Sequence, residues 1–251
     1  MSVNDNKLPA ALLQSLHDVE GFNEAAFARV HESGDKVVSI RLNPLKTIKN
    51  VFPDAERVPW SNYGYYLPSR PSFILDPLLH AGTYYVQEAS GMFLELCIRQ
   101  YAAVSQPLKV LDLCAAPGGK STLIQSVISN TSLLVSNEVI KSRVGTLVEN
   151  LSKWGGANVI VTNNDPKDFS RLENFFDVMV VDAPCSGSGL FRRDPEAIEQ
   201  WSEDLVEMCG LRQKRILGDA YLALKKNGLL IYSTCSYSKQ EDEEIADWLV
   251  Q

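Results

Sequence analysis

The sequence predicts an α/β fold in which a small mixed N-terminal module precedes a doubly wound, mainly parallel sheet. Three observations predict it: short runs of Val, Ile and Leu, longer segments of helical period between them, and small or polar residues directly after each run. Parallel strands covered by helices on both faces read as near-continuous apolar runs, and their crossovers are right-handed. Such sheets bind ligands beyond the carboxyl ends of their strands, so we expect the site there.

The regular pattern contains five strands and three long helices. We expect the strands at residues 109–113, 133–136, 158–161, 177–181 and 229–233. We expect the helices at residues 121–128, 141–153 and 202–224. In the last of these helices we expect an apolar stripe to face the core, namely Leu205, Met208, Leu211, Ala220 and Leu224.

The chain divides into an N-terminal module at residues 1–80 and a larger domain at residues 81–251. In the module we expect a helix at 9–16 and a strand at 37–42. A stretch rich in proline and aromatic residues follows, which is typical of loops and short strands. The larger domain carries the regular strand and helix pattern.

Composition excludes several classes of protein. With 251 residues, of which 45% are apolar, the chain can bury a sizeable core. It has neither a long uncharged apolar run nor the N-terminal segment of a signal peptide, which predicts a cytoplasmic protein. The five cysteines include no Cys-x-x-Cys pair, so we expect reduced thiols, no disulfides and no metal site. The net charge of −7 by itself argues against a nucleic-acid partner.

The loop after the first strand is predicted to hold a cofactor. It consists of small residues and two glycines, which let a ligand approach the backbone before the next helix begins: Cys114, Ala115, Ala116, Pro117, Gly118, Gly119 and Lys120. The alternative of an ordinary turn is less favoured by so many small residues. A phosphate-binding P-loop is excluded by spacing, because its first glycine would stand where Cys114 stands.

Acidic residues follow the second and third strands. Glu138 lies about 20 positions beyond the glycines, where an acidic residue accepts hydrogen bonds from a ribose. An acidic residue at the start of a helix is also a favourable partner of the helix dipole. Asp165 after the third strand can accept from an adenine amino group, and a turn before Pro166 explains it equally well.

The fourth and fifth strands each end in a cysteine, Cys185 and Cys235. If the strand order is 3-2-1-4-5, these strands are neighbours at about 4.8 Å and the first and fourth flank the cofactor crevice. Both thiols would then face the reactive part of the cofactor. Polar, glycine-rich surroundings favour reactive positions for both. A single cysteine is usually an inert small hydrophobe, which is our interpretation of Cys97, Cys114 and Cys209.

Together these segments resemble the Nop/Sun-type RNA cytosine-C5 methyltransferases, and within that family the ribosomal small-subunit enzymes. The resemblance rests on residues 112–120, Asp-Ala-Pro-Cys at 182–185 and Ser-Thr-Cys-Ser at 233–236, and it covers roughly residues 36–250. It implies a Rossmann-like methyltransferase sheet and S-adenosylmethionine as cofactor. It also implies that residues 114–120, Glu138, Arg143, Asp165 and Asp182 contact that cofactor.

For the chemistry, the resemblance implies that Cys235 is the attacking thiolate and that Cys185 helps to release the product. We assign to Asp182 a hydrogen bond or proton donation at N3 of the base. The run at 39–46 resembles the family's N-terminal RNA-binding module, with Pro44 where a threonine is usual. The target base must be unpaired or flipped out, because the ring is attacked on its face.

The resemblance implies an RNA partner, most simply ribosomal RNA, and no membrane partner. Transfer RNA as the substrate, or a catalytically silent RNA-binding factor for ribosome assembly, are the alternatives. Sheets of this class usually continue with two further strands after the fifth, whereas this chain stops at Gln251, so we expect a truncated domain whose fifth strand is an edge. The sequence leaves open the target nucleotide and the oligomeric state.

Overall fold

The computed structural model describes residues 7–46 and 51–251. It separates into two compact units, each built from segments that are distant in sequence. Unit 1 contains Met1–Lys36, Ala183–Gly218 and Ser233–Gln251. Unit 2 contains Val37–Asp182 and Asp219–Tyr232.

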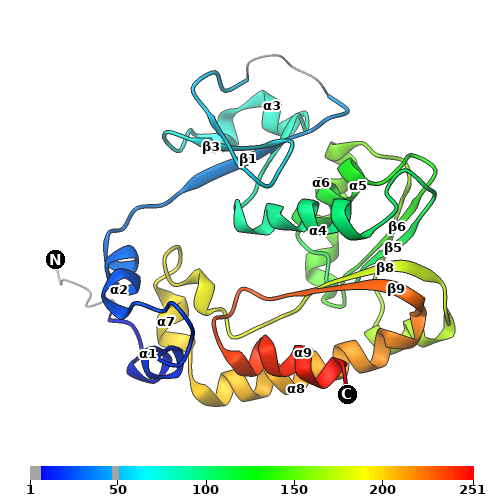
Figure 1. The fold of residues 1–251 in the computed structure, drawn as a ribbon. Coiled ribbons are helices and arrows are strands. Elements are labelled where there is room, and N and C mark those ends of the chain that lie inside the picture. The colour runs from blue at the N-terminus through cyan, green and yellow to red at the C-terminus, as the bar shows by residue number, and fades with distance from the viewer. Residues whose placement is uncertain (1–6, 47–50) are drawn as a thin grey trace. The chain divides into compact units, whose positions relative to one another are not determined.

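A five-stranded sheet forms the centre of unit 2 (Figure 1). Its strands are β5 (Lys109–Asp112), β6 (Leu133–Asn137), β7 (Val159–Thr162), β8 (Phe176–Asp182) and β9 (Leu224–Ser233). Their order is β7-β6-β5-β8-β9, and β5 pairs in parallel with both β6 and β8, as β6 does with β7. The predicted fold class and strand order are therefore confirmed, and β9 stands at the end of this order.

The core of unit 2 follows from the apolar strands and the helices packed on them. The helices are α4 (Phe93–Tyr101), α5 (Gly119–Val127) and α6 (Lys141–Trp154). In α6 the buried residues are Leu147, Leu151 and Trp154, whose spacing places them on one face of a helix. The helix ends at Gly155, which has the left-handed conformation that commonly stops a helix.

A second, antiparallel sheet in unit 2 has the order β2-β3-β1-β4. Its strands are β1 (Val38–Leu42), β2 (Glu56–Arg57), β3 (Gly64–Leu67) and β4 (Tyr84–Val86). The short helix α3 (Pro77–His80) precedes β4 and begins where Asp76 accepts a hydrogen bond from the backbone of Leu78. The sheet extends beyond residue 80, where the sequence division placed a boundary, and takes in β4.

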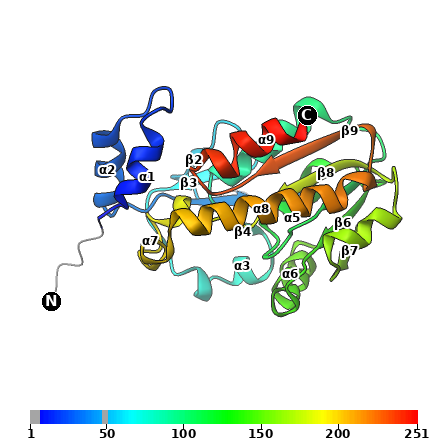
Figure 2. The same ribbon diagram turned by 90° about the horizontal axis from the view of Figure 1, so that it is seen from below.

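Unit 1 consists of helices and the loops between them. They are α1 (Ala10–Leu16), α2 (Glu24–Glu32), α7 (Glu196–Gln200), α8 (Glu203–Ala220, which continues into unit 2) and α9 (Glu243–Leu249). Leu12 and Leu16 of α1 pack with Phe191 in one buried cluster. Helices α8 and α9 lie side by side in both views (Figures 1 and 2), and a Cβ on Gly218 of α8 would touch Trp248 of α9.

The predicted core stripe of α8 is wrong. Met208 and Leu211 are exposed, and Leu205 is only partly buried. The buried positions include Val206, Cys209, Gln213, Ile216, Leu217 and Ala220. Of the predicted stripe only Ala220 belongs to this buried face. The helix also ends earlier than predicted, because Leu224 is the first residue of β9. Within the described residues, no helix is long and apolar enough to span a membrane.

Candidate active site

The loop predicted to hold a cofactor begins after a buried acidic residue, Asp112, at the end of β5. Its Oδ2 accepts a hydrogen bond from Ser121 Oγ at 2.6 Å, and Ser136 Oγ lies 2.9 Å from Ser121 Oγ. Its Oδ1 is buried and has no hydrogen-bond partner among the described residues. Burial raises the pKa of Asp112 to about 7. A buried acceptor without a partner is costly, so this atom is suited to a ligand that brings a donor.

The loop itself turns sharply into α5. Gly118 has φ +113°, a conformation that strongly favours glycine, and a Cβ there would press against Leu147 at 3.3 Å. The Ala116–Pro117 peptide bond is cis. Asn150 of α6 donates a hydrogen bond to the Pro117 carbonyl at 2.8 Å. This backbone and the open acceptor on Asp112 fit a bound cofactor.

Glu138 and Arg143, both predicted to contact the cofactor, lie against the same loop, and their contact with a cofactor stays a prediction. Glu138 is buried, and its carboxylate accepts from the backbone N–H of Ala116 at 3.3 Å and of Ile140 at 2.8 Å. Arg143 donates to the Ala116 carbonyl at 2.7 Å and lies 3.4 Å from the Glu138 carboxylate. These two side chains therefore brace the loop in addition to any contact with a ligand.

Three further predicted residues, Lys120, Asp182 and Asp165, have partners in unit 2. Lys120 Nζ lies 2.7 Å from Asp182 Oδ2, so the end of the loop is joined to the end of β8. The Asp165 carboxylate accepts from the backbone N–H of Lys167 at 3.2 Å, which starts the 3₁₀ turn Pro166–Arg171. Asp165 thus occupies the turn position that the alternative interpretation described, and its contact with a cofactor stays a prediction.

Cys114 lies within the loop as a neutral thiol. Burial, followed by the nearby carboxylates of Asp112, Glu138 and Asp182, raises the pKa of Cys114 to about 12. The thiolate form is therefore negligible near pH 7. This agrees with the interpretation of Cys114 as a packing residue rather than a nucleophile.

The remaining two predicted cysteines meet in unit 1. The Cys185 and Cys235 sulfurs lie 3.2 Å apart, within hydrogen-bonding distance. Their loops leave β8 and β9 together, since the backbone N–H of Ala183 donates to the Ser233 carbonyl at 2.9 Å. Cys235 is exposed and Cys185 is partly buried. The hydrogen bond with Cys235, and then burial, raise the pKa of Cys185 well above its usual range, so Cys185 is a protonated thiol at neutral pH.

Asp112 is the site residue that sequence reasoning missed. The sequence pattern places it at the end of the first strand and gives no separate sign of a ligand contact. The available signal was its place after Lys109-Val110-Leu111, where a charge ends an apolar strand directly before the small-residue loop. Only the structure shows that one of its oxygens is buried without a partner.

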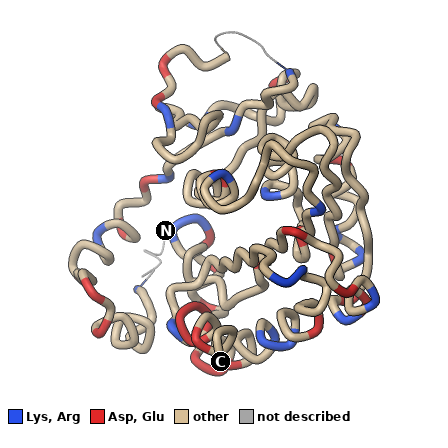
Figure 3. The backbone as a smooth tube through the Cα atoms, turned by 45° about the vertical axis from the view of Figure 1, so that its right-hand side comes forward, with Lys and Arg blue, Asp and Glu red and all other residues tan. Residues whose placement is uncertain are grey.

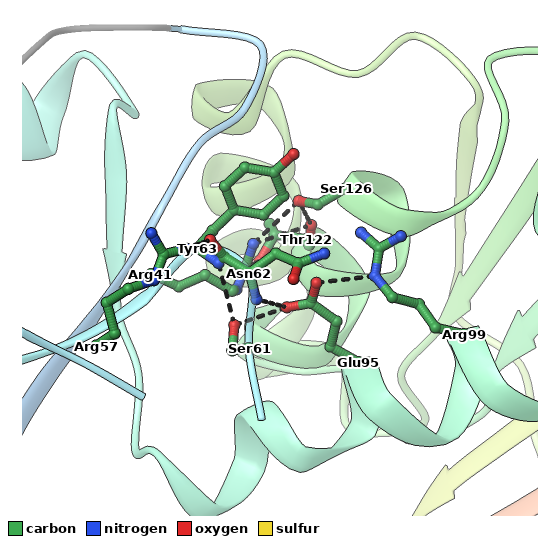
Figure 4. Close-up of polar contacts among 9 residues, drawn as sticks. All are labelled: Arg41, Arg57, Ser61, Asn62, Tyr63, Glu95, Arg99, Thr122 and Ser126. Atoms are coloured by element: carbon green, nitrogen blue, oxygen red, sulfur yellow. Dashed lines mark hydrogen bonds and ion pairs between the residues drawn. The ribbon is translucent and has the colours of Figure 1, made fainter. Parts of the chain in front are cut away.

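The N-terminal sheet supports the helix that follows the loop. Arg41 of β1 is fully buried and donates to Thr122 Oγ1 at 2.6 Å and to Ser126 Oγ at 3.0 Å, both on α5 (Figure 4). In the same view, Glu95 of α4 accepts from Ser61 and from Arg99. Arg41 lies in the run that resembles an RNA-binding module, yet it makes contacts inside the protein.

A family profile described as 16S rRNA methyltransferase RsmB/F matches residues 103–251. The profile for the N-terminal domain of 16S rRNA methyltransferase RsmF matches residues 8–89. The chain belongs to the RsmB/F methyltransferase family. The expected resemblance is therefore confirmed, and S-adenosylmethionine is the cofactor of this Rossmann-like methyltransferase fold.

Relatives in the RsmB/F family cover most of this chain. A ribosomal RNA small subunit methyltransferase F from Pectobacterium atrosepticum is 32% identical over 96% of the chain and 52% of its own length. The protein of the same name from Shewanella piezotolerans is 35% identical over 85% of the chain and 47% of its own length. The chain thus spans about half the length of these curated relatives.

Solved structures share the fold of this RsmB/F member. A methyltransferase homologue from Pyrococcus horikoshii superposes with a TM-score of 0.73 at 28% identity, covering 97% of this chain and 83% of that one. NSun6 from Pyrococcus horikoshii with SFG superposes with a TM-score of 0.82, covering 98% of this chain and 88% of that one. At 16% identity, the second likeness shows the fold alone.

Proposed function

We propose that this protein methylates C5 of cytosine in RNA, most simply small-subunit ribosomal RNA, through a covalent adduct with Cys235. The contact between the Cys185 and Cys235 sulfurs at 3.2 Å carries the proposal. Membership of a 16S rRNA methyltransferase family supports the choice of ribosomal RNA. The closeness of two thiols supports a reaction that needs one sulfur to attack and a second group to help remove it.

C5 of cytosine is too weak a nucleophile to take a methyl group directly. Addition of the Cys235 sulfur to C6 makes C5 electron-rich, and Asp182 assists by holding a proton at N3. S-adenosylmethionine, when bound, supplies the methyl group that C5 takes. The C5 proton must then leave and the bond between C6 and sulfur must break, which restores the ring and the Cys235 thiolate.

Cys185 is suited to the second half of this sequence. While Cys235 is free, the hydrogen bond between the thiols keeps Cys185 protonated, because that bond raises its pKa. Once Cys235 is bonded to C6, its sulfur is a thioether and a weaker acceptor. The pKa of Cys185 then loses its largest upward contribution, while burial continues to raise it. The Cys185 thiol can lose its proton and take the C5 proton, directly or through water.

Side chains and the loop of unit 2 would bind the cofactor. The Asp112 carboxylate, with its unpartnered oxygen, receives a cationic donor such as the ammonium of the methyl donor. Glu138 accepts from the ribose, and residues 114–120 with Arg143 shape the loop around the ligand. Asp165 is assigned to the adenine amino group.

Variants of the two cysteines test the proposal, because the two thiols have different tasks. Cys235→Ala removes the nucleophile, so methyl transfer should fall by several orders of magnitude and no covalent adduct should form. Cys185→Ala leaves attack and methyl transfer intact but slows elimination, so protein joined to methylated RNA should accumulate. Each variant of the complete gene product is incubated with substrate RNA and cofactor, then run on a denaturing gel.

A shifted band is expected for Cys185→Ala alone, and Cys209→Ala, at a buried cysteine in α8, serves as the matched control. A shifted band from Cys235→Ala instead would reverse the two assignments. Rapid turnover by both variants would exclude the covalent mechanism.

A further inference from the structure

A single buried carboxylate joins the two cysteine loops. Glu241 ends the 3₁₀ turn Lys239–Glu241 and is fully buried. Its Oε2 accepts from Ser186 Oγ at 2.5 Å and from Ser236 Oγ at 2.6 Å. Its Oε1 accepts from the Ser186 backbone N–H at 2.9 Å. Ser186 directly follows Cys185 and Ser236 directly follows Cys235, so one carboxylate binds the neighbour of each thiol.

A glutamine of α8 completes this arrangement. Gln213 Nε2 donates to Glu241 Oε1 at 3.0 Å and to the Pro184 carbonyl at 3.1 Å. Among the described residues of unit 1, the Glu241 carboxylate therefore receives at least four hydrogen bonds. An ionised carboxylate is an acceptor with about four lone-pair sites, and its bonds are stronger than those between neutral groups. The site is thus matched to a carboxylate.

Two backbone contacts keep the same loops together beside the thiols. The Gly189 N–H donates to the Cys235 carbonyl at 2.6 Å, and the Tyr237 N–H donates to Ser188 Oγ at 2.8 Å. A Cβ on Gly189 would lie 2.3 Å from the Cys235 carbonyl oxygen, so the two backbones touch. These contacts hold the two loops together, and the Glu241 hydrogen bonds act on the residues directly after the two thiols.

Glu241 differs from its acidic neighbours. It begins an acidic run with Asp242, Glu243 and Glu244, which lies close to the C-terminal end of the chain (Figure 3). Glu243 and Glu244 are exposed, whereas Glu241 is turned into unit 1. A run of acids is ordinarily a solvated face, whereas Glu241 in this run is buried and accepts hydrogen bonds from the residues after both cysteines.

We propose that Glu241 is a positioning residue that sets the distance between the Cys185 and Cys235 sulfurs and so controls how efficiently the adduct is resolved. This inference rests on the proposed function, since it matters for turnover only if both thiols act on one base. Misplacing a catalytic group by about 1 Å can cost about 10²-fold in rate. Loss of the carboxylate removes hydrogen bonds to the residue after each cysteine at once.

The first test measures thiol spacing without RNA or cofactor. Phenylarsine oxide bridges two close thiols: two As–S bonds form and the oxygen leaves as water with both thiol protons. The native chain should be bridged rapidly at Cys185 and Cys235, which mass spectrometry of peptides locates. Glu241→Ala should slow bridging by at least about tenfold while leaving alkylation of single thiols unchanged or faster. Glu244→Ala, at an exposed position of the same run, is the matched control and should bridge like the native chain.

Glu241→Gln is the conservative variant. Its amide oxygen can still accept from Ser186 and Gln213, and serine hydroxyls can rotate to accept from its amide N–H groups. We expect it to recover most of the bridging rate. A thermal melt shows whether Glu241→Ala folds. If it does not fold, Ser236→Ala takes its place in the test. That variant removes one hydrogen bond to the Glu241 carboxylate and should slow bridging to a smaller extent.

The second test measures turnover in the complete gene product with substrate RNA. Glu241→Ala should lower kcat by about 10²-fold, with the affinity for S-adenosylmethionine unchanged, because the cofactor residues lie in unit 2. Unchanged bridging in folded Glu241→Ala or Ser236→Ala overturns the inference, and so does slowed bridging with unchanged kcat. If native protein bridges rapidly but never forms an RNA adduct, even as Cys185→Ala, the proposed function fails and the geometric role of Glu241 survives.

Discussion

Glu138 shows how one buried side chain serves both the cofactor loop and the turn that carries it. Its two oxygens accept from Ala116 and Ile140, so the loop and the start of α6 depend on the same carboxylate. We predict that Glu138→Ala weakens S-adenosylmethionine binding by about 1–3 kcal/mol, since the loop loses its brace and the ligand loses the ribose acceptor that we propose. Titration calorimetry measures this directly.

Asp165 provides the comparison for Glu138. Its carboxylate already caps a turn, and Asp165→Ala should also weaken cofactor binding by about 1–3 kcal/mol, because the proposed acceptor for the adenine amino group is lost. Glu149→Ala, at an exposed position of α6, should leave the affinity unchanged. Native affinity in both Glu138→Ala and Asp165→Ala would remove these residues from the cofactor site.

At the residue scale, the sequence could predict side chains whose place follows from the ends of strands. Cys185 and Cys235 were predicted to be neighbours because β8 and β9 were predicted to be neighbours, and the sulfurs do meet. Asp112 and Glu241 could not be predicted in this way. Their importance comes from burial and from the number of donors around each carboxylate, and neither quantity is readable from residue spacing.

Arg41 connects two elements, the β1 strand and the α5 helix. It donates to Thr122 and Ser126 and its guanidinium lies 4.4 Å from the centre of the Trp154 ring. Burial lowers the pKa of Arg41 to about 9. We predict that Arg41→Lys destabilises the fold by about 1–3 kcal/mol, because an ammonium cannot reproduce the forked donors and leaves buried acceptors unpaired. Denaturant unfolding is the measurement.

The control for Arg41 lies in the same sheet. Arg57 of β2 is exposed and packs over Tyr65, so Arg57→Lys should change the free energy of unfolding by less than about 0.5 kcal/mol. Equal effects of the two substitutions would mean that burial of Arg41 adds nothing to stability.

At the scale of a single element, helix α8 shows where hydrophobic periodicity predicts the wrong buried face. Its apolar residues at 205, 208 and 211 predicted one buried face, whereas the helix buries the face with Cys209 and Gln213. Gln213 is drawn inward by hydrogen bonds to Glu241 and Pro184. Hydrophobic periodicity counts Gln213 as a surface residue and so assigns the wrong face. The strands were easier to predict, because central parallel strands are buried on both faces.

At the scale of the whole molecule, the fold class could be predicted from the sequence, whereas the set of chain segments that forms each unit could not. Alternating apolar runs and helical segments determine a parallel sheet almost by themselves. Unit 1 instead assembles three segments that are far apart in sequence. Contacts such as those of Glu241 with Ser186 connect residues from different segments, and local patterns carry no information on them.

The pH dependence of the whole molecule's stability provides the last prediction. Burial raises the pKa of Asp112 from 3.8 to about 7 and that of Asp242 to about 6. Below about pH 4 the folded and the unfolded chain both keep the carboxyl protons of Asp112 and Asp242. As the pH rises, the unfolded chain loses these protons first, so unfolding becomes easier. The contribution of Asp112 to stability is therefore full at low pH and is lost as pH rises through about 7.

We expect the melting temperature of the ligand-free protein to fall between about pH 4 and about pH 7, and Asp112→Asn to reduce this fall. Asparagine keeps an acceptor for Ser121 but carries no charge, so the difference between the two melting curves isolates Asp112.

A cationic ligand beside the open Asp112 oxygen favours the ionised carboxylate. The native protein should therefore bind S-adenosylmethionine more tightly as pH rises through about 7, and Asp112→Asn should not. Thermal shift measured with and without cofactor tests both statements. Identical pH slopes for native protein and Asp112→Asn would place the titrating group elsewhere and remove Asp112 from the cofactor site.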